Sequence, residues 1–154
     1  MMKPLSNLFK ISSYIALSGW VVLIGFPFWQ FGHALVLSIS VLLLCGIYTF
    51  LVFFGKKFDG EQKVKGSFWS FKGVVSLFKT PRVVLAGWVH YLAFDLMVGL
   101  YIVMDAANLG ISHWMLLPCL FLTLMFGPAG LLAYFVLKIA VVQDFLLIST
   151  SYLI

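Results

Sequence analysis

The stretch VLLLCGIYTFLVFF at residues 41–54 decides the fold class of this chain. It contains no charged residue, and it lacks the alternation of polar and apolar positions that marks a strand of a membrane β-barrel. Only helices and closed barrels satisfy every backbone hydrogen bond inside lipid, so this run predicts a membrane-spanning helix. Extended back to residue 31, it reaches the roughly 20 residues that a hydrocarbon core of about 30 Å requires.

Three further stretches reach this length with few or no charges. The four predicted spans are residues 11–29, 31–54, 83–104 and 114–137. Because 63% of the 154 residues are hydrophobic and only 10% are charged, an ordinary soluble domain is excluded. We expect residues 1–154 to form one all-α membrane domain, a bundle of four transmembrane helices built from two hairpins. The apolar tail 139–154 is short and contains Asp144, so it is expected to be an interfacial or helix-packed extension.

All basic residues fall on one side of this predicted bundle. Lys3 and Lys10 flank the first span, Lys138 closes the fourth, and the loop 55–82 holds the rest, while the connections near 30–33 and 105–113 hold none. The excess of lysine and arginine on cytoplasmic loops then places this loop and both termini in the cytoplasm. Topology and attraction to anionic lipids account for the net charge of +5, so membrane lipids are expected partners and no nucleic acid is.

The loop 55–82 contains a pattern of its own at residues 67–79. Its apolar stripe has helical spacing and a second stripe is basic; the members are Phe68, Phe71, Val75 and Phe78, and Lys65, Lys72 and Lys79. This pattern predicts a short amphipathic helix lying in the headgroup layer. A lid over a cytoplasm-facing pocket is the alternative.

Two titratable side chains, His90 and Asp95, lie well inside a predicted span, and both belong to the third. A charged carboxylate at the bilayer centre costs between about 3 and 17 kcal/mol, so such a residue is a candidate functional group. Burial disfavours the charged form, and Asp95 is therefore expected to be neutral near pH 7. A purely structural role in joining helices is the alternative.

The depth of Asp95 suggests its neighbours on the fourth span. At 1.5 Å per residue, Asp95 lies level with Leu124. Pro128 has no N–H and leaves the carbonyl of Leu124 without its helical partner, so a protonated Asp95 is expected to donate there. The hydroxyl of Thr123 is expected close by, and small residues, Gly127 and Gly130, would allow the helices to approach.

His90 is predicted to look elsewhere. Five residues separate it from Asp95, which puts the two side chains about 140° apart on a helix. Its depth matches that of Ser18 or Trp20 in the first span and Tyr48 in the second. A hydrogen-bonded structural histidine and an acid or base both remain open for His90.

Three further polar residues lie at the opposite boundary, where spans begin or end. Two histidines and a carboxylate, His33, Asp105 and His113, are ligands that zinc or iron accepts. Sequence distance does not show that they meet, so ordinary interfacial capping is expected and neither a metal nor a cofactor is.

The third and fourth spans carry a set of residues that resembles a known family. The set runs from Ser76-Leu77-Phe78 and Pro81, through Trp88-x-His90-Tyr91-x-Ala93-Phe94-Asp95-Leu96 and Gly99, to Asp105, Gly110-Ile111-x-His113, Pro118-Cys119, Thr123 and Phe126-Gly127-Pro128-x-Gly130-Leu131. On these residues the chain resembles the abscisic-acid-deficient-four-like family, also described as neoxanthin synthase-like. The likeness is strong over 76–137 and weaker over 11–54, where Trp20 and Pro27 are the best anchors.

This resemblance implies a small polytopic protein that acts on, or beside, a carotenoid or isoprenoid ligand. The plant member is associated with neoxanthin synthesis, in which an epoxide opens and an allene forms. This reaction requires an acid that donates a proton to the epoxide oxygen and a base that removes a ring-adjacent proton. The implied catalytic residues are Asp95 as the acid and His90 as the base. The expected substrate-binding residues are Trp88, Tyr91, Gly99, Tyr101, Thr123 and Pro128. The chain lacks the leading transit region of the plant pattern, so a bacterial-type member in the bacterial inner membrane is expected.

Two other functions fit the same residues. In a non-catalytic accessory protein, the aromatic residues would serve only as a slot for a pigment or lipid. In a proton-linked transporter, Asp95 would carry the proton across the membrane. Four short helices would then need a homo-oligomer, such as a dimer, to enclose a path.

Overall fold

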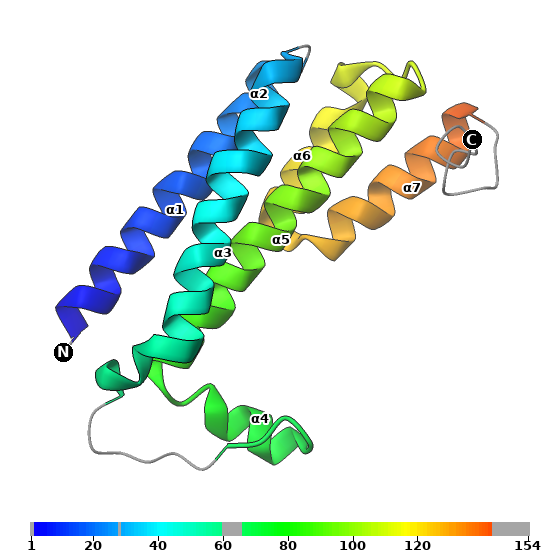
Figure 1. Cartoon of the computed structure of the whole chain (residues 1–154). Coiled ribbons are helices and arrows are strands. Elements are labelled where there is room, and N and C mark those ends of the chain that lie inside the picture. The colour runs from blue at the N-terminus through cyan, green and yellow to red at the C-terminus, as the bar shows by residue number, and fades with distance from the viewer. Residues whose placement is uncertain (1, 28, 60–65, 143–154) are drawn as a thin grey trace, which may run out of the picture. The chain divides into compact units, whose positions relative to one another are not determined.

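The computed structural model describes residues 2–27, 29–59 and 66–142, and every regular element in these ranges is helical (Figure 1). The predicted all-α fold class is confirmed for them. The elements are α1 (Met2–Gly25), α2 (Gln30–Leu35), α3 (Leu42–Thr49), α4 (Phe71–Leu77), α5 (Pro81–Asn108), α6 (His113–Phe126) and α7 (Pro128–Val142). Two π-helical segments, Val36–Val41 and Phe50–Phe54, and a 3-10 turn, Gly55–Phe58, join α2 and α3 into one rod.

Within the described ranges, three helical stretches are long and apolar enough to cross a membrane. They are Lys3–Gly25, Gln30–Phe58 and Pro81–Asn108, and they overlap the first three predicted spans, the first of which was placed several residues too far along the chain. The predicted extension 139–154 lies outside the described residues from position 143 onward, as do Lys63 and Lys65 of the basic loop.

The fourth predicted span is wrong, because residues 114–137 form two helices and not one. The chain reverses at Gly127, so that α6 and α7 form an antiparallel hairpin (Figure 1). Gly127 has a φ of +32°, a conformation that L side chains avoid, and Pro128 cannot donate a helical hydrogen bond. With 14 and 15 residues, each helix is about 21–23 Å long, which is shorter than a hydrocarbon core of about 30 Å.

The chain falls into two compact units. The first consists of Met1–Gly19 with Ser38–Ala93, and the second of Trp20–Leu37 with Phe94–Ile154. In the first unit an ion pair fastens the start of α5: Arg82 Nε lies 2.6 Å from Asp59 Oδ1, and Arg82 Nη1 donates to the carbonyl of Leu51 at 2.8 Å.

The amphipathic helix predicted over 67–79 is present but shorter, as α4. The hydroxyl of Ser70 caps it by accepting from the backbone N–H of Gly73 at 3.1 Å, which sets the start of the helix after residue 70. The aromatic side chains around it are almost fully exposed, with Phe68, Trp69 and Phe71 at 82%, 97% and 84%. The role of this surface as a membrane anchor stays a prediction.

The core of the second unit contains closely packed aliphatic side chains. Leu96, Ile102, Leu116 and Leu120 are fully buried or nearly so, and they come from α5 and α6. Gly99 of α5 packs against α1: a Cβ at this position would lie 2.6 Å from the indole of Trp20. The close approach of α1 and α5 therefore depends on a residue without a side chain.

Candidate functional site

The carboxyl group of Asp95 lies against the turn between α6 and α7. A Cβ at Gly127 would collide with Oδ1 and lie 3.1 Å from Oδ2, so the carboxyl touches the backbone where the chain reverses. Asp95 is only 6% exposed. The sequence predicted that Asp95 lies level with Leu124 and gave Gly127 only as a residue that lets the helices approach; in the structure the carboxyl contacts Gly127 itself, at a turn and not beside the middle of a straight helix.

This turn brings the carboxyl close to the start of α7. α7 begins at Pro128, so its N-terminal end, which carries a partial positive charge, is next to the position that Asp95 occupies. The N–H groups of Gly130 and Leu131 both donate to the carbonyl of Gly127, at 3.0 and 3.2 Å.

Thr123 lies at the same turn but uses its hydroxyl within α6. Its Oγ1 donates to the carbonyl of Cys119 at 2.8 Å, and the side chain is fully buried. Gly130 packs directly on Thr123, where a Cβ would collide with its backbone and hydroxyl. The predicted donation from Asp95 to the carbonyl of Leu124 stays a prediction.

Exposed apolar side chains flank the buried carboxyl in sequence. Phe94 precedes Asp95 and is 54% exposed, while Met125 and Phe126 lead into the turn at 58% and 65%. Pro128 is exposed as well. In a membrane these side chains would face lipid, so an apolar ligand can reach the turn from the bilayer without crossing water.

Asp105, further along α5, forms a buried polar cluster with Tyr134 and Lys138 of α7, and we call these three residues the Asp105 cluster. The Tyr134 hydroxyl and Lys138 Nζ both donate to Asp105 Oδ2, at 2.6 and 2.7 Å. All three residues are at most 2% exposed. The predicted substrate-binding residue Tyr101 contacts this cluster through Tyr134: the two ring centroids are 6.3 Å apart in an edge-on arrangement.

The Asp105 cluster corrects the predicted position of Lys138. The sequence placed Lys138 and Asp105 at opposite membrane boundaries, but their ion pair puts them at the same end of α5. The reversal at Gly127 is the reason, because it turns α7 back toward the end at which α6 begins. The signal that was missed is the spacing of Tyr134 and Lys138, which share one face of a helix and mark an intramembrane partner for a carboxylate.

The three polar residues proposed as capping or metal ligands do not share one site, although His33 and His113 are close enough to interact electrostatically. Asp105 is held in its cluster, and His113 Nε2 lies 2.9 Å from the carbonyl oxygen of Ile24, which can only accept a hydrogen bond. His33 Nε2 is buried with no hydrogen-bond partner among the described residues. Across residues 2–27, 29–59 and 66–142, no group of three or more His, Cys, Asp or Glu could hold a metal ion.

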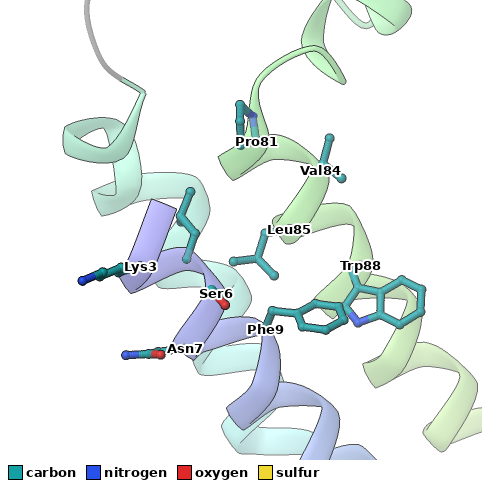
Figure 2. A pocket seen from close by; sticks show the side chains of 9 residues that line it. Lys3, Ser6, Asn7, Phe9, Pro81, Val84, Leu85 and Trp88 are labelled. Carbon is teal, nitrogen blue, oxygen red and sulfur yellow. The ribbon is translucent and has the colours of Figure 1, made fainter. Parts of the chain in front are cut away.

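In the first unit, Trp88 and Tyr91 belong to an aromatic row beside a groove. The Trp88 ring centroid lies 5.8 Å from that of Phe9 and 5.6 Å from that of Tyr91. Figure 2 shows the rings of Phe9 and Trp88 side by side between α1 and α5, with Leu85 close by. The groove has a volume of about 700 Å³, in the range of sites for small ligands.

His90 has an aromatic neighbour, as its depth predicted. Its ring lies 5.5 Å from that of Tyr48, and the side chain is exposed. Because α5 is one continuous helix from Pro81 to Asn108, the predicted angle of about 140° between His90 and Asp95 holds. The two side chains therefore meet different neighbours, as the sequence indicated.

Comparison with known proteins identifies the family of this chain. No curated protein and no solved structure matches the chain. The family model described as ABA DEFICIENT 4-like matches residues 7–134, a range that includes Trp88, His90, Asp95 and the turn at Gly127. The chain therefore belongs to the ABA DEFICIENT 4-like family.

Proposed function

We propose that this protein is an intramembrane enzyme that isomerises a carotenoid or a related isoprenoid by acid catalysis. The observation that carries the proposal is the Asp95 carboxyl, 6% exposed, in contact with the turn between α6 and α7. Family membership and the three helices that are apolar enough to cross a membrane support an apolar, membrane-dissolved substrate.

The surroundings of Asp95 suit a group that gives up a proton. Burial favours the neutral acid before reaction, and the dipole of α7 stabilises the carboxylate that proton transfer leaves behind. In the opening of an epoxide to an allene, a proton is added to the epoxide oxygen as its C–O bond breaks. Another proton leaves the neighbouring carbon as the second double bond forms, so the molecular formula is unchanged.

The expected base for this second proton is His90. His90 fits by chemistry, because a neutral imidazole accepts a proton near pH 7. The His90 side chain projects from α5 at about 140° to that of Asp95. His90 would therefore contact a different part of the ligand from the part that contacts Asp95. We therefore rest the proposal on Asp95 and keep His90 as the expected base.

The test is an analysis of pigments from a bacterial host that makes epoxidised carotenoids and also produces this protein. The parent is expected to yield a new isomer of unchanged mass and altered retention. In Asp95→Asn the amide keeps the shape of the carboxyl but is no acid, so the isomer should fall by at least about 100-fold. Asp59→Asn, the same chemical change at the Arg82 ion pair, should leave the yield of isomer unaltered.

The amounts of both variants in the membrane must equal that of the parent, since Asp95 packs against Gly127. An Asp95→Asn variant that is present in full amount and still makes the isomer would refute acid catalysis by this residue. Asp95→Glu, which restores a carboxylic acid, should recover part of the activity.

A second function, binding of a pigment or lipid without conversion, is favoured by the row of Phe9, Trp88 and Tyr91 beside the groove of Figure 2. Aromatic faces can stack on a polyene without chemistry. The same pigment analysis separates the two functions, because an accessory protein would co-purify with its pigment unchanged, and Asp95→Asn would not alter the amount bound.

A further inference from the structure

A second groove lies in the second unit, between the start of the α2–α3 rod and the end of α5. Its volume is about 540 Å³. On the rod it is lined at helical spacing by Gln30, His33, Ala34 and Leu37, and on α5 by Leu100, Met104, Ala107 and Asn108. Each set covers one face of its helix over about two turns, so the groove follows the two helices.

The lining changes from polar to apolar along the groove. Gln30 and Asn108 lie at the helix ends, where the membrane meets water, and one turn further in stands His33. Beyond it Leu37, Leu100 and Met104 contribute only apolar surface. Such a gradient fits a ligand with one polar group near its end and a hydrocarbon body.

His33 supplies the reason to expect a specific polar group. Its Nε2 is buried without a hydrogen-bond partner among the described residues, and a buried polar atom in this state is costly. The χ2 torsion of histidine is broad, so rotation of the imidazole can present a ring nitrogen to the groove. A hydroxyl group both donates and accepts, and it therefore pairs with either tautomer of the ring.

We propose that this groove binds the hydroxyl-bearing ring end of a carotenoid or isoprenoid, with His33 as the hydrogen-bond partner of that hydroxyl. This inference rests on the proposed function, because it assigns a specificity site to the same class of ligand. The groove would select hydroxylated pigments over their hydrocarbon parents, since a ligand without the hydroxyl leaves His33 without a partner.

The experiment measures binding of two pigments to the purified full chain in phosphatidylcholine nanodiscs, by quenching of tryptophan fluorescence. One pigment is a carotenoid with a hydroxyl on each ring, and the other is its hydrocarbon parent. The parent protein is expected to prefer the diol about tenfold, the effect of one hydrogen bond. His33→Leu should lose this preference and keep its affinity for the hydrocarbon, which also shows that the variant is folded.

Two variants sharpen the result. His33→Gln keeps a side chain that donates and accepts, so it should retain most of the preference for the diol. Ala34→Trp fills the groove and should weaken binding of both pigments.

Three results would overturn the inference. The first is equal binding of the two pigments by the unmutated protein. The second is a His33→Leu variant that still prefers the diol, and the third is that the unmutated protein binds neither pigment. In the first two cases an Asp95-dependent isomer in the pigment analysis would still uphold the proposed function, while loss of both binding and conversion would end both proposals.

Discussion

At the scale of single residues, the Asp105 cluster buries two opposite charges. Asp105 and Lys138 are each about 2% exposed and share one hydrogen-bonded contact. The attraction inside a buried ion pair does little more than offset the loss of solvation. Removal of one partner, however, leaves the other charge buried without a counter-charge, and this destabilises the fold.

We expect Lys138→Met to lower the free energy of unfolding by about 3–5 kcal/mol, and Asp105→Asn by a similar amount. The double variant should be less destabilised than the sum of the two, because it leaves no isolated charge. Chemical denaturation in detergent, followed by circular dichroism, measures all three variants. Tyr134→Phe, which removes one hydrogen bond and no charge, should cost only about 1–2 kcal/mol, and strictly additive single effects would contradict the coupling.

At the scale of secondary-structure elements, the reversal between α6 and α7 depends on Gly127. Gly127→Ala should destabilise the hairpin for two reasons, the φ of +32° and the collision of the new Cβ with the Asp95 carboxyl. A positive φ costs an L residue about 1–2 kcal/mol, and overpacking adds about 1–3 kcal/mol. Thermal unfolding in detergent measures the total.

Gly110→Ala is the matched control for this substitution. Gly110 also has a positive φ, +68°, but a Cβ there meets nothing within 4 Å, so it pays only the backbone cost. Gly127→Ala should therefore be the more destabilised of the two, and Asp95→Ala should remove much of the difference. Equal effects at both glycines would show that the carboxyl does not press on the turn.

The turn also marks the limit of what local sequence predicted. Length and hydropathy identified α1, the α2–α3 rod and α5, because those properties are local. They could not distinguish a kinked span over 114–137 from a hairpin, since Pro128 is compatible with both. The choice depends on the conformation of Gly127 and on the distant pairing of Lys138 with Asp105, which no local pattern contains.

The candidate site was predictable to the same extent. Matching depths on neighbouring helices placed Asp95 level with Leu124 and His90 level with Tyr48, but they did not predict the contact of the Asp95 carboxyl with Gly127. The position of Gly99 against Trp20 did not, because small residues in a span fit a ligand and a neighbouring helix equally well. That His33 Nε2 has no hydrogen-bond partner among the described residues could not be predicted, because it depends on how the side chains pack in three dimensions.

At the scale of the whole molecule, the Asp105 cluster changes how the charges define orientation. Lys138 is neutralised by Asp105 and buried, so it is removed from the set of basic residues that favour the cytoplasm. The lysines of α1 and the basic loop 55–82 remain, and that loop is still expected in the cytoplasm. As α5 is a continuous helix that is long enough to cross, its far end is expected on the opposite side, together with Lys138.

This topology makes a prediction that separates three crossings plus a hairpin from a bundle of four crossings. In a background with Cys45 and Cys119 changed to serine, single cysteines replace Lys72 of α4 and Val141 of α7, both exposed in the described chain. A membrane-impermeant maleimide added to intact cells should label Val141→Cys, as it should the control Ser112→Cys between α5 and α6. Lys72→Cys should react only after the cells are permeabilised. A fourth crossing would instead protect Val141→Cys in intact cells while Ser112→Cys still reacts, and the re-entrant hairpin would then be refuted in the membrane.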